Sequence, residues 1–151
     1  MHIEGNSMKT CEQCGNPVPD AAYVCPYCQG HDMDVPRGAL VVRRIDLGHV
    51  GLSVQEAREQ LQDAMAVASF RGEDVLVVVH GYGSSGVGGH IRSMVRSEAK
   101  RATAERTVSG WTPGEQLRTE TAKDLVRRLP ALSGIDAWQR ENPGMTIIVV
   151  R

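Results

Sequence analysis

The sequence predicts an α/β fold, in which strands and helices alternate, preceded by a small cysteine-rich module. All four cysteines lie within the first 28 of the 151 residues. Residues 75–79 are five apolar residues, four of them β-branched, as is typical of a central strand buried on both faces. Segments with apolar residues at helical spacing, 54–68 and 91–102, lie on either side of this strand in the sequence. The order strand, helix, strand, helix predicts a parallel strand pair with right-handed crossovers.

Length and charge limit what the chain can do. One ordinary domain with a small appendage fits 151 residues. The chain carries 17 Lys+Arg against 18 Asp+Glu, so any affinity for nucleic acid must come from a local basic face. No apolar run approaches the ~18 residues of a membrane span, and residues 1–10 lack the apolar core of a signal peptide. We therefore expect a soluble cytoplasmic protein without membrane contact, and we interpret residues 1–10 as a disordered tail or a cloning remnant.

The cysteines form two Cys-x-x-Cys pairs separated by ten residues, a spacing that directs four thiolates to one tetrahedral centre. Gly15 follows the first pair, where a tight knuckle favours a residue that tolerates positive φ. Because residues 11–32 hold too little apolar area to fold alone, metal binding would supply the missing free energy. A redox dithiol and disulfides are the alternatives. We predict a structural zinc ribbon, with no position left for a catalytic water, whose ligands are Cys11, Cys14, Cys25 and Cys28.

A polar linker, 33–38, is expected between this ribbon and an α/β domain that spans residues 39–151. Within the domain, Ser53 is a good helix N-cap, and Glu56 three residues later completes a capping box. The expected elements are strands over 40–47, 75–79 and 145–150, helices over 53–71, 88–102 and 121–129, a short strand at 107–108, a turn over 111–114 and a loop over 133–144.

A glycine-rich loop follows the central strand and opens the next helix. Its glycines let the backbone approach a ligand, and free N–H groups at a helix start favour an anion such as phosphate. The loop matches Gly-x-Gly-x-x-Gly, but no third parallel strand with an acidic tip follows, which argues against a dinucleotide site. The next helix is basic, and two arginines share its face near the loop. The residues predicted to bind nucleic acid are Gly81, Tyr82, Gly83, Ser84, Ser85, Gly86, His90, Arg92 and Arg96.

Three titratable side chains are expected at the ends of the first two strands. His80 lies at the C-terminal end of the central strand, where open α/β sheets tend to place their sites. If the two strands are parallel neighbours, Asp46 and His49 come within reach of this histidine. Since a carboxylate beside a histidine orients the ring and tunes its pKa, these three residues are the candidate catalytic groups. The alternative interpretation is that Asp46 caps a loop and His80 packs the turn.

These motifs resemble those of the Smr family, the small MutS-related domain. Asp46-Leu47 resembles the start of the family's Asp-Leu-His-Gly motif, with the histidine displaced here to His49, and residues 80–86 resemble its His-Gly-x-Gly-x-Gly motif. Residues 142–150 are similar to the last strand of one branch of the family. The resemblance covers residues 39–151 and leaves the zinc ribbon outside.

The resemblance implies both a fold and an activity. The implied fold is a two-layer α/β sandwich with a mixed sheet, similar to the C-terminal domain of translation initiation factor three. The implied function is nucleic-acid binding, often with DNA-nicking or RNA-cleaving endonuclease activity. The functional residues of the family lie in the two motifs. The resemblance therefore assigns function here to Asp46, Leu47, His80, Gly81 and Gly83.

Our hypothesis is a protein that binds DNA or RNA and cleaves its phosphodiester backbone. The glycine loop and Arg92 would hold the phosphate, and His80 would act as general acid or base. Asp46 would orient the histidine or hold a divalent ion such as Mg²⁺ or Mn²⁺. The displaced histidine favours an alternative, a non-catalytic adaptor that grips structured nucleic acid or a ribosome. A third alternative is a small-molecule nucleotide enzyme.

Overall fold

The computed structural model describes residues 8–11, 14–19, 25, 27–28, 40–48, 51–82 and 86–150. Its strands are β1 (Met8–Thr10), β2 (Pro17–Pro19), β3 (Val42–Asp46), β4 (Val75–Val79), β5 (Gly110–Pro113) and β6 (Met145–Val149). Its α-helices are α1 (Val54–Arg71), α2 (Gly86–Ala104) and α3 (Glu120–Arg128), and two 3₁₀ helices follow over Pro130–Gly134 and Asp136–Trp138. The predicted linker, 33–38, lies outside the described residues.

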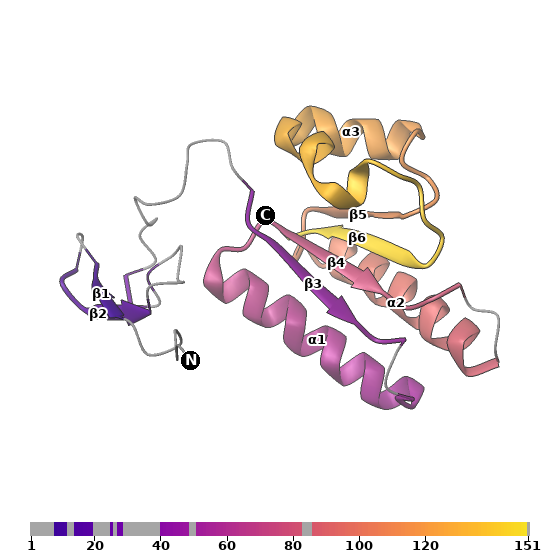
Figure 1. The fold of residues 1–151 in the computed structure, drawn as a ribbon, viewed down its shortest axis with the longest axis horizontal. Helices are drawn as coiled ribbons and strands as arrows, with labels where there is room; N and C mark the ends of the chain where they lie inside the picture. Colours follow the sequence, from indigo (N-terminus) through magenta and orange to yellow (C-terminus); the bar gives the residue numbers. More distant parts are fainter. Residues whose placement is uncertain are drawn as a thin grey trace, which may run out of the picture.

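Four strands form a mixed sheet in the order β3-β4-β6-β5 (Figure 1). β3 and β4 are parallel, and Asp46 pairs with Val79. β6 runs antiparallel to β4 and places Met145 opposite Val79. The C-terminal ends of β3 and β4 and the beginning of β6 therefore lie at the same end of the sheet. For β3 and β4, the strand-helix-strand order predicts this parallel arrangement.

Helices cover both faces of the sheet. On one face α1 and α2 pack over Leu76, Val78 and Ile148, with Leu61 and Val95 in the same core. On the other face α3 and the first 3₁₀ helix pack over β4 and β6, in a second core that contains Val75, Val77, Leu125, Leu132, Ile147 and Val149. β4 is buried on both faces, as its run of β-branched residues predicts. The α/β fold with a mixed sheet is confirmed, and the C-terminal helices add a cover on the second face.

The ends of α1 follow the local sequence signals. The Ser53 hydroxyl accepts a hydrogen bond from the Glu56 N–H at 3.1 Å, and the Glu56 carboxylate accepts one from the Ser53 N–H at 3.1 Å. This is the predicted capping box. Gly72 ends the helix with φ of 69°, a left-handed conformation that glycine adopts without strain.

Two predictions for the third quarter of the domain were wrong. Residues 107–108 are not a strand, and the predicted turn over 111–114 is mostly strand β5, in which Trp111 pairs with Ile148. The pairing partner lies more than thirty residues away in the sequence, so local turn residues such as Pro113 and Gly114 gave the wrong signal. The predicted loop over 133–144 includes the 3₁₀ turn at Asp136–Trp138.

The N-terminal module contains a two-stranded antiparallel sheet, in which Met8 pairs with Pro19. β1 thus begins three residues before Cys11, within the segment interpreted from the sequence as a tail. Gly15 has φ of 77°, as the knuckle predicts. Among the helices of the described ranges, none combines the length and apolarity needed to cross a bilayer.

Candidate functional site

Three chain segments converge where β3 and β4 end. The carbonyl of Gly144, just before β6, accepts hydrogen bonds from the N–H groups of His80 at 2.9 Å and Gly81 at 3.1 Å. Gly48 lies against the same backbone, because a Cβ added there would come 3.1 Å from the His80 carbonyl carbon and oxygen. Gly81 itself has φ of 80°, in the left-handed region that favours glycine. The structure therefore brings the two predicted motif segments into contact.

His80 is buried inside this junction, with only 1% of its surface exposed. Its Nδ1 lies 2.8 Å from the Gly81 carbonyl oxygen, and its Nε2 lies 2.9 Å from the Thr146 hydroxyl oxygen. Since a carbonyl only accepts, Nδ1 carries the proton, and in the neutral ring Nε2 then accepts from the Thr146 hydroxyl. Burial is the largest cause that lowers the pKa of His80, and the charges of Arg96 and Arg92 add to it against the opposing bond to Gly81.

Asp46 is exposed at the end of β3, and its Oδ1 accepts a hydrogen bond from the Gly48 N–H at 2.8 Å. Its strand partner is Val79, so its side chain leaves the sheet on the face opposite to the one that His80 shares with Val78. Both ring nitrogens of His80 have hydrogen-bond partners other than this carboxylate, namely the Gly81 carbonyl and the Thr146 hydroxyl. The bond from Gly48 to Asp46 and the packed His80 ring are contacts of the kind that the alternative interpretation describes, and the catalytic roles of both residues stay predictions.

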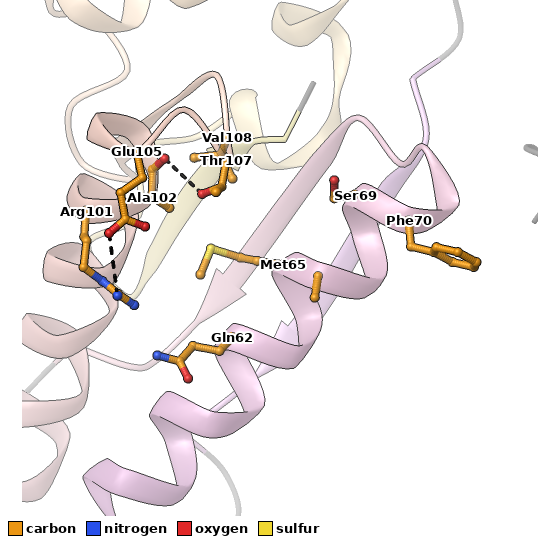
Figure 2. Close-up of a pocket in the computed structure, with 10 residues that line it drawn as sticks. Gln62, Met65, Ser69, Phe70, Arg101, Ala102, Glu105, Thr107 and Val108 are labelled. Carbon is orange, nitrogen blue, oxygen red and sulfur yellow. Dashed lines mark hydrogen bonds and ion pairs between the residues drawn. The ribbon is translucent and has the colours of Figure 1, made fainter. Parts of the chain in front are cut away.

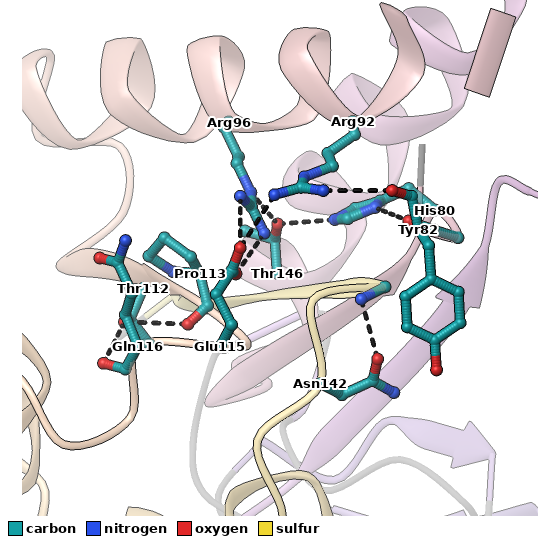
Figure 3. A network of polar contacts seen from close by, with 12 residues as sticks. His80, Tyr82, Arg92, Arg96, Thr112, Pro113, Glu115, Gln116, Asn142 and Thr146 are labelled. Atoms are coloured by element: carbon teal, nitrogen blue, oxygen red, sulfur yellow. Dashed lines mark hydrogen bonds and ion pairs between the residues drawn. The ribbon is translucent and has the colours of Figure 1, made fainter. Parts of the chain in front are cut away.

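Two arginines on α2 meet a carboxylate beside this junction (Figure 3). Arg96 donates to Glu115 through both terminal nitrogens, at 2.6 and 3.1 Å, and Arg92 donates to the same carboxylate at 2.9 Å. Arg92 also donates to the Tyr82 carbonyl at 3.1 Å, and Arg96 Nε donates to Thr146 at 3.3 Å. The cluster of two guanidinium groups and one carboxylate keeps one net positive charge, with side chains 18 to 30% exposed.

A rigid turn places Glu115. A Cβ at Gly114 would come 2.2 Å from the Asn142 carbonyl oxygen, so only glycine fits between β5 and the chain before β6. Burial raises the pKa of Glu115, but hydrogen bonds and charges from Arg96 and Arg92 outweigh it and lower the pKa. Glu115 and Thr146 were not among the site residues expected from the sequence. One sequence feature could have indicated a role for Thr146, because it is a polar residue inside the apolar strand β6.

Two more of the predicted site residues, Tyr82 and His90, face solvent. Tyr82 is 66% exposed, and in Figure 3 its ring points away from the arginines. His90 is exposed on the first part of α2, and Gly86 is the first residue of that helix. Of the predicted site residues, four lie outside the described residues: His49, Gly83, Ser84 and Ser85.

The four cysteines of the N-terminal module form a second candidate site. Their sulfur atoms all lie within 4.8 Å of one another, with Cys11 Sγ 3.7 Å from Cys28 Sγ and Cys14 Sγ 3.5 Å from Cys25 Sγ. Tetrahedral Zn–S bonds of about 2.3 Å would separate the sulfurs by about 3.8 Å, so the donor set fits such a metal ion.

Hydrogen bonds donated to two of the sulfurs favour the thiolate form, which is the form that binds a metal ion. The Tyr27 N–H donates to Cys25 Sγ at 3.4 Å, and the Asn16 side-chain amide donates to Cys14 Sγ at 3.3 Å. A backbone hydrogen bond from Asn16, followed by smaller contributions, lowers the pKa of Cys14 to about 6. These four cysteines could therefore bind a metal such as zinc as thiolates.

A groove of about 520 Å³ lies between the C-terminal parts of α1 and α2 (Figure 2). Met65, Ala102 and Val108 line it, and its carboxylate, Glu105, pairs with Arg101 at 3.9 Å. It lies at the end of the helices remote from His80, because α1 ends just before β4 begins. The described residues that line it include no convergent buried polar groups, so the strand-end junction is the candidate site.

The family of the chain is shown by comparison with known proteins. The Smr domain profile matches residues 45–128, more than half of the sequence, and the chain belongs to this family. Smr domains are associated with nucleic-acid binding and with nicking endonuclease activity. Among solved structures, the chain is similar to the Smr domain of Thermus thermophilus MutS2, with 20% identity and a TM-score of 0.47, over 72% of this chain and 98% of that one. No curated protein matches the sequence.

Proposed function

We propose that this protein binds the phosphate backbone of DNA or RNA at the junction of β3, β4 and β6. The observation that carries the proposal is the pair of arginines, Arg92 and Arg96, held side by side next to the exposed Tyr82. Guanidinium groups bind phosphate oxygens bidentately, and an exposed tyrosine ring offers a surface on which a base stacks. The net positive charge of the cluster favours a polyanion even though the whole chain is nearly neutral.

Phosphodiester cleavage is the second candidate function, and the exposed carboxylate of Asp46 favours it. This carboxylate lies at the end of β3, beside the end of β4 but on the other face of the sheet from the His80 ring, and it offers oxygen ligands for Mg²⁺ or Mn²⁺. Catalytic roles for Asp46, His49 and His80 stay predictions. For His80 to exchange a proton with a substrate, Thr146 or Gly81 would have to release the ring.

The two candidates differ in one assay. Wild-type protein is incubated with supercoiled plasmid and with a structured RNA, with Mg²⁺ or Mn²⁺, beside the variants Asp46→Asn and His80→Asn. Nicking that is lost in Asp46→Asn, while binding persists, supports the endonuclease. Binding that weakens with salt and never yields product supports the adaptor, and ribosome co-sedimentation then tests its partner. Absence of binding to either nucleic acid at low salt would contradict both.

For the N-terminal module, the proposed cofactor is one structural Zn²⁺ on Cys11, Cys14, Cys25 and Cys28. The mutual approach of the four sulfurs supports it. Because four thiolates complete the tetrahedron, the ion would fold the module rather than act on a substrate.

A further inference from the structure

A continuous chain of hydrogen bonds links Glu115 to the glycine loop. The Glu115 carboxylate binds Arg96, whose Nε donates to the Thr146 hydroxyl. That hydroxyl lies 2.9 Å from His80 Nε2, and Nδ1 of the same ring lies 2.8 Å from the Gly81 carbonyl. This series of hydrogen bonds runs from the turn after β5 through α2 and β6 to the end of β4, so it joins elements that are far apart in the sequence.

For a neutral His80 ring, donor and acceptor chemistry assigns a direction to each of these hydrogen bonds. Arg96 can only donate, so the Thr146 oxygen accepts from it and its own proton is free to go to His80. The Gly81 carbonyl can only accept, so the ring holds its proton on Nδ1 and offers a lone pair at Nε2. Among the residues of this hydrogen-bond series, Thr146 both accepts and donates through one atom, its hydroxyl oxygen, and it is fully buried.

Packing alone does not require a threonine at this position. The other four residues of β6 are apolar, and valine has nearly the same shape as threonine. A buried hydroxyl is unfavourable unless it is hydrogen-bonded, so the polar residue is explained by its two partners.

We infer that Thr146 is a positioning residue: its hydroxyl donates to Nε2 while the Gly81 carbonyl accepts from Nδ1, and the two bonds together hold the neutral His80 ring and the backbone from Gly81 to Tyr82 in place. This inference rests on the proposed function, since that backbone carries Tyr82 and meets Arg92. Glu115 anchors the other end by holding Arg96 in place. A nucleic acid would therefore meet a strand-end junction that is ordered before binding, which lowers the entropic cost of association.

The test compares Thr146→Val with Thr146→Ser, because serine keeps the hydroxyl and valine keeps the shape. Thr112→Val is the matched control, since Thr112 is also a buried strand threonine but its hydroxyl bonds to the backbone carbonyls of Pro113 and Gln116 rather than to a histidine. The first readout is ¹⁵N NMR of the His80 ring, and the second is amide hydrogen exchange at His80 and Gly81. The third is the Kd for a fluorescein-labelled RNA hairpin and a labelled DNA strand.

We expect wild-type His80 to be protonated at Nδ1 and hydrogen-bonded at Nε2. In Thr146→Val the Nε2 resonance should move to that of a nitrogen without a hydrogen bond, the two amides should exchange faster, and the Kd should rise about tenfold. Thr146→Ser and Thr112→Val should stay within about twofold of wild type.

Two results would overturn the inference. One is a wild-type ring protonated at Nε2, which can be seen even if Thr146→Val fails to fold. The other is a folded Thr146→Val whose ring signals and amide exchange match wild type. If wild type shows the expected ring form but binds neither probe, the proposed function fails and the positioning of the ring by Thr146 stands.

Discussion

Gly48 packs directly against the backbone of His80, and this contact joins the two sequence motifs of the domain. A Cβ at Gly48 would lie 3.1 Å from the carbonyl carbon and oxygen of His80, closer than side chains normally approach a backbone. The carbonyl cannot easily retreat, because the Gly81 N–H of the same peptide group donates to the Gly144 carbonyl. The ends of β3 and β4 therefore form one unit.

The first prediction follows from this contact. Gly48→Ala should push the β3 loop away from His80 and destabilise the domain by about 1–2 kcal/mol, measured by denaturant unfolding. Nucleic-acid affinity should fall as well, because the same backbone carries Tyr82. Gly134→Ala is the control, since nothing lies within 4 Å of a Cβ built there. Equal stability of the two variants would show that the contact is not tight.

The arginine pair predicts a specific dependence of binding on salt. A side chain that contacts phosphate adds about one to the slope of log K against log salt, so Arg92→Gln and Arg96→Gln should each lower this slope by about one. Arg127→Gln on α3 is the control, because α3 covers the opposite face of the sheet. Equal slopes for all three variants would remove the arginine pair from the interface. The measurement is fluorescence anisotropy from 50 to about 200 mM salt.

The cysteine cluster predicts one tightly bound Zn²⁺ per chain. Cobalt substitution should give the visible absorption of a tetrahedral thiolate site, and Cys25→Ser should abolish it. The α/β domain should unfold at an unchanged temperature in this variant, because its two cores contain none of the described residues of the cysteine module. If the purified protein instead has no titratable thiols under denaturing, non-reducing conditions, the disulfide alternative is correct.

The parts of the fold that local signals determine could be predicted from the sequence. The capping box at Ser53 and the β-branched run of β4 are each complete within a few residues. β5 could not be predicted in this way, because Trp111 and Thr112 become strand only by pairing with Ile148 and Ile147 of β6. Tertiary pairing overrides the turn chemistry of the Pro-Gly sequence that follows.

The relation between Asp46 and His80 was predictable in part. Parallel neighbours bring their strand ends together, as expected, but side chains alternate between faces. Ile45 and Leu47 pack into the core beneath α1, which places Asp46 on the other face, while His80 follows Val78 into that core. The alternation was present in the sequence. The buried ring contacts Thr146, and the arginine–carboxylate cluster lies beyond it. These contacts depend on where β6 and the turn after β5 lie in the fold, and local sequence patterns do not predict those positions.

Burial of His80 predicts how stability depends on pH. The pKa of the ring is lowered in the folded state, chiefly by burial, so the unfolded chain takes up its proton at higher pH than the folded one. The stabilisation by neutral His80 is therefore complete above the unfolded pKa of about 6.5, and it is lost as the pH falls towards the lower folded pKa. The loss cannot exceed about 1.4 kcal/mol per pH unit for one group.

This dependence is isolated by comparing wild type with His80→Asn, because the other histidines titrate equally in both. Asparagine can still donate to the Gly81 carbonyl, but it does not titrate. Wild type should be the more stable protein at pH 7.5, and the difference in free energy of unfolding should narrow steadily from pH 6.5 to pH 5. A difference that stays constant over this range would mean that the folded protein accepts a proton at His80 as easily as the unfolded chain, and that the ring is not held neutral by its buried contacts.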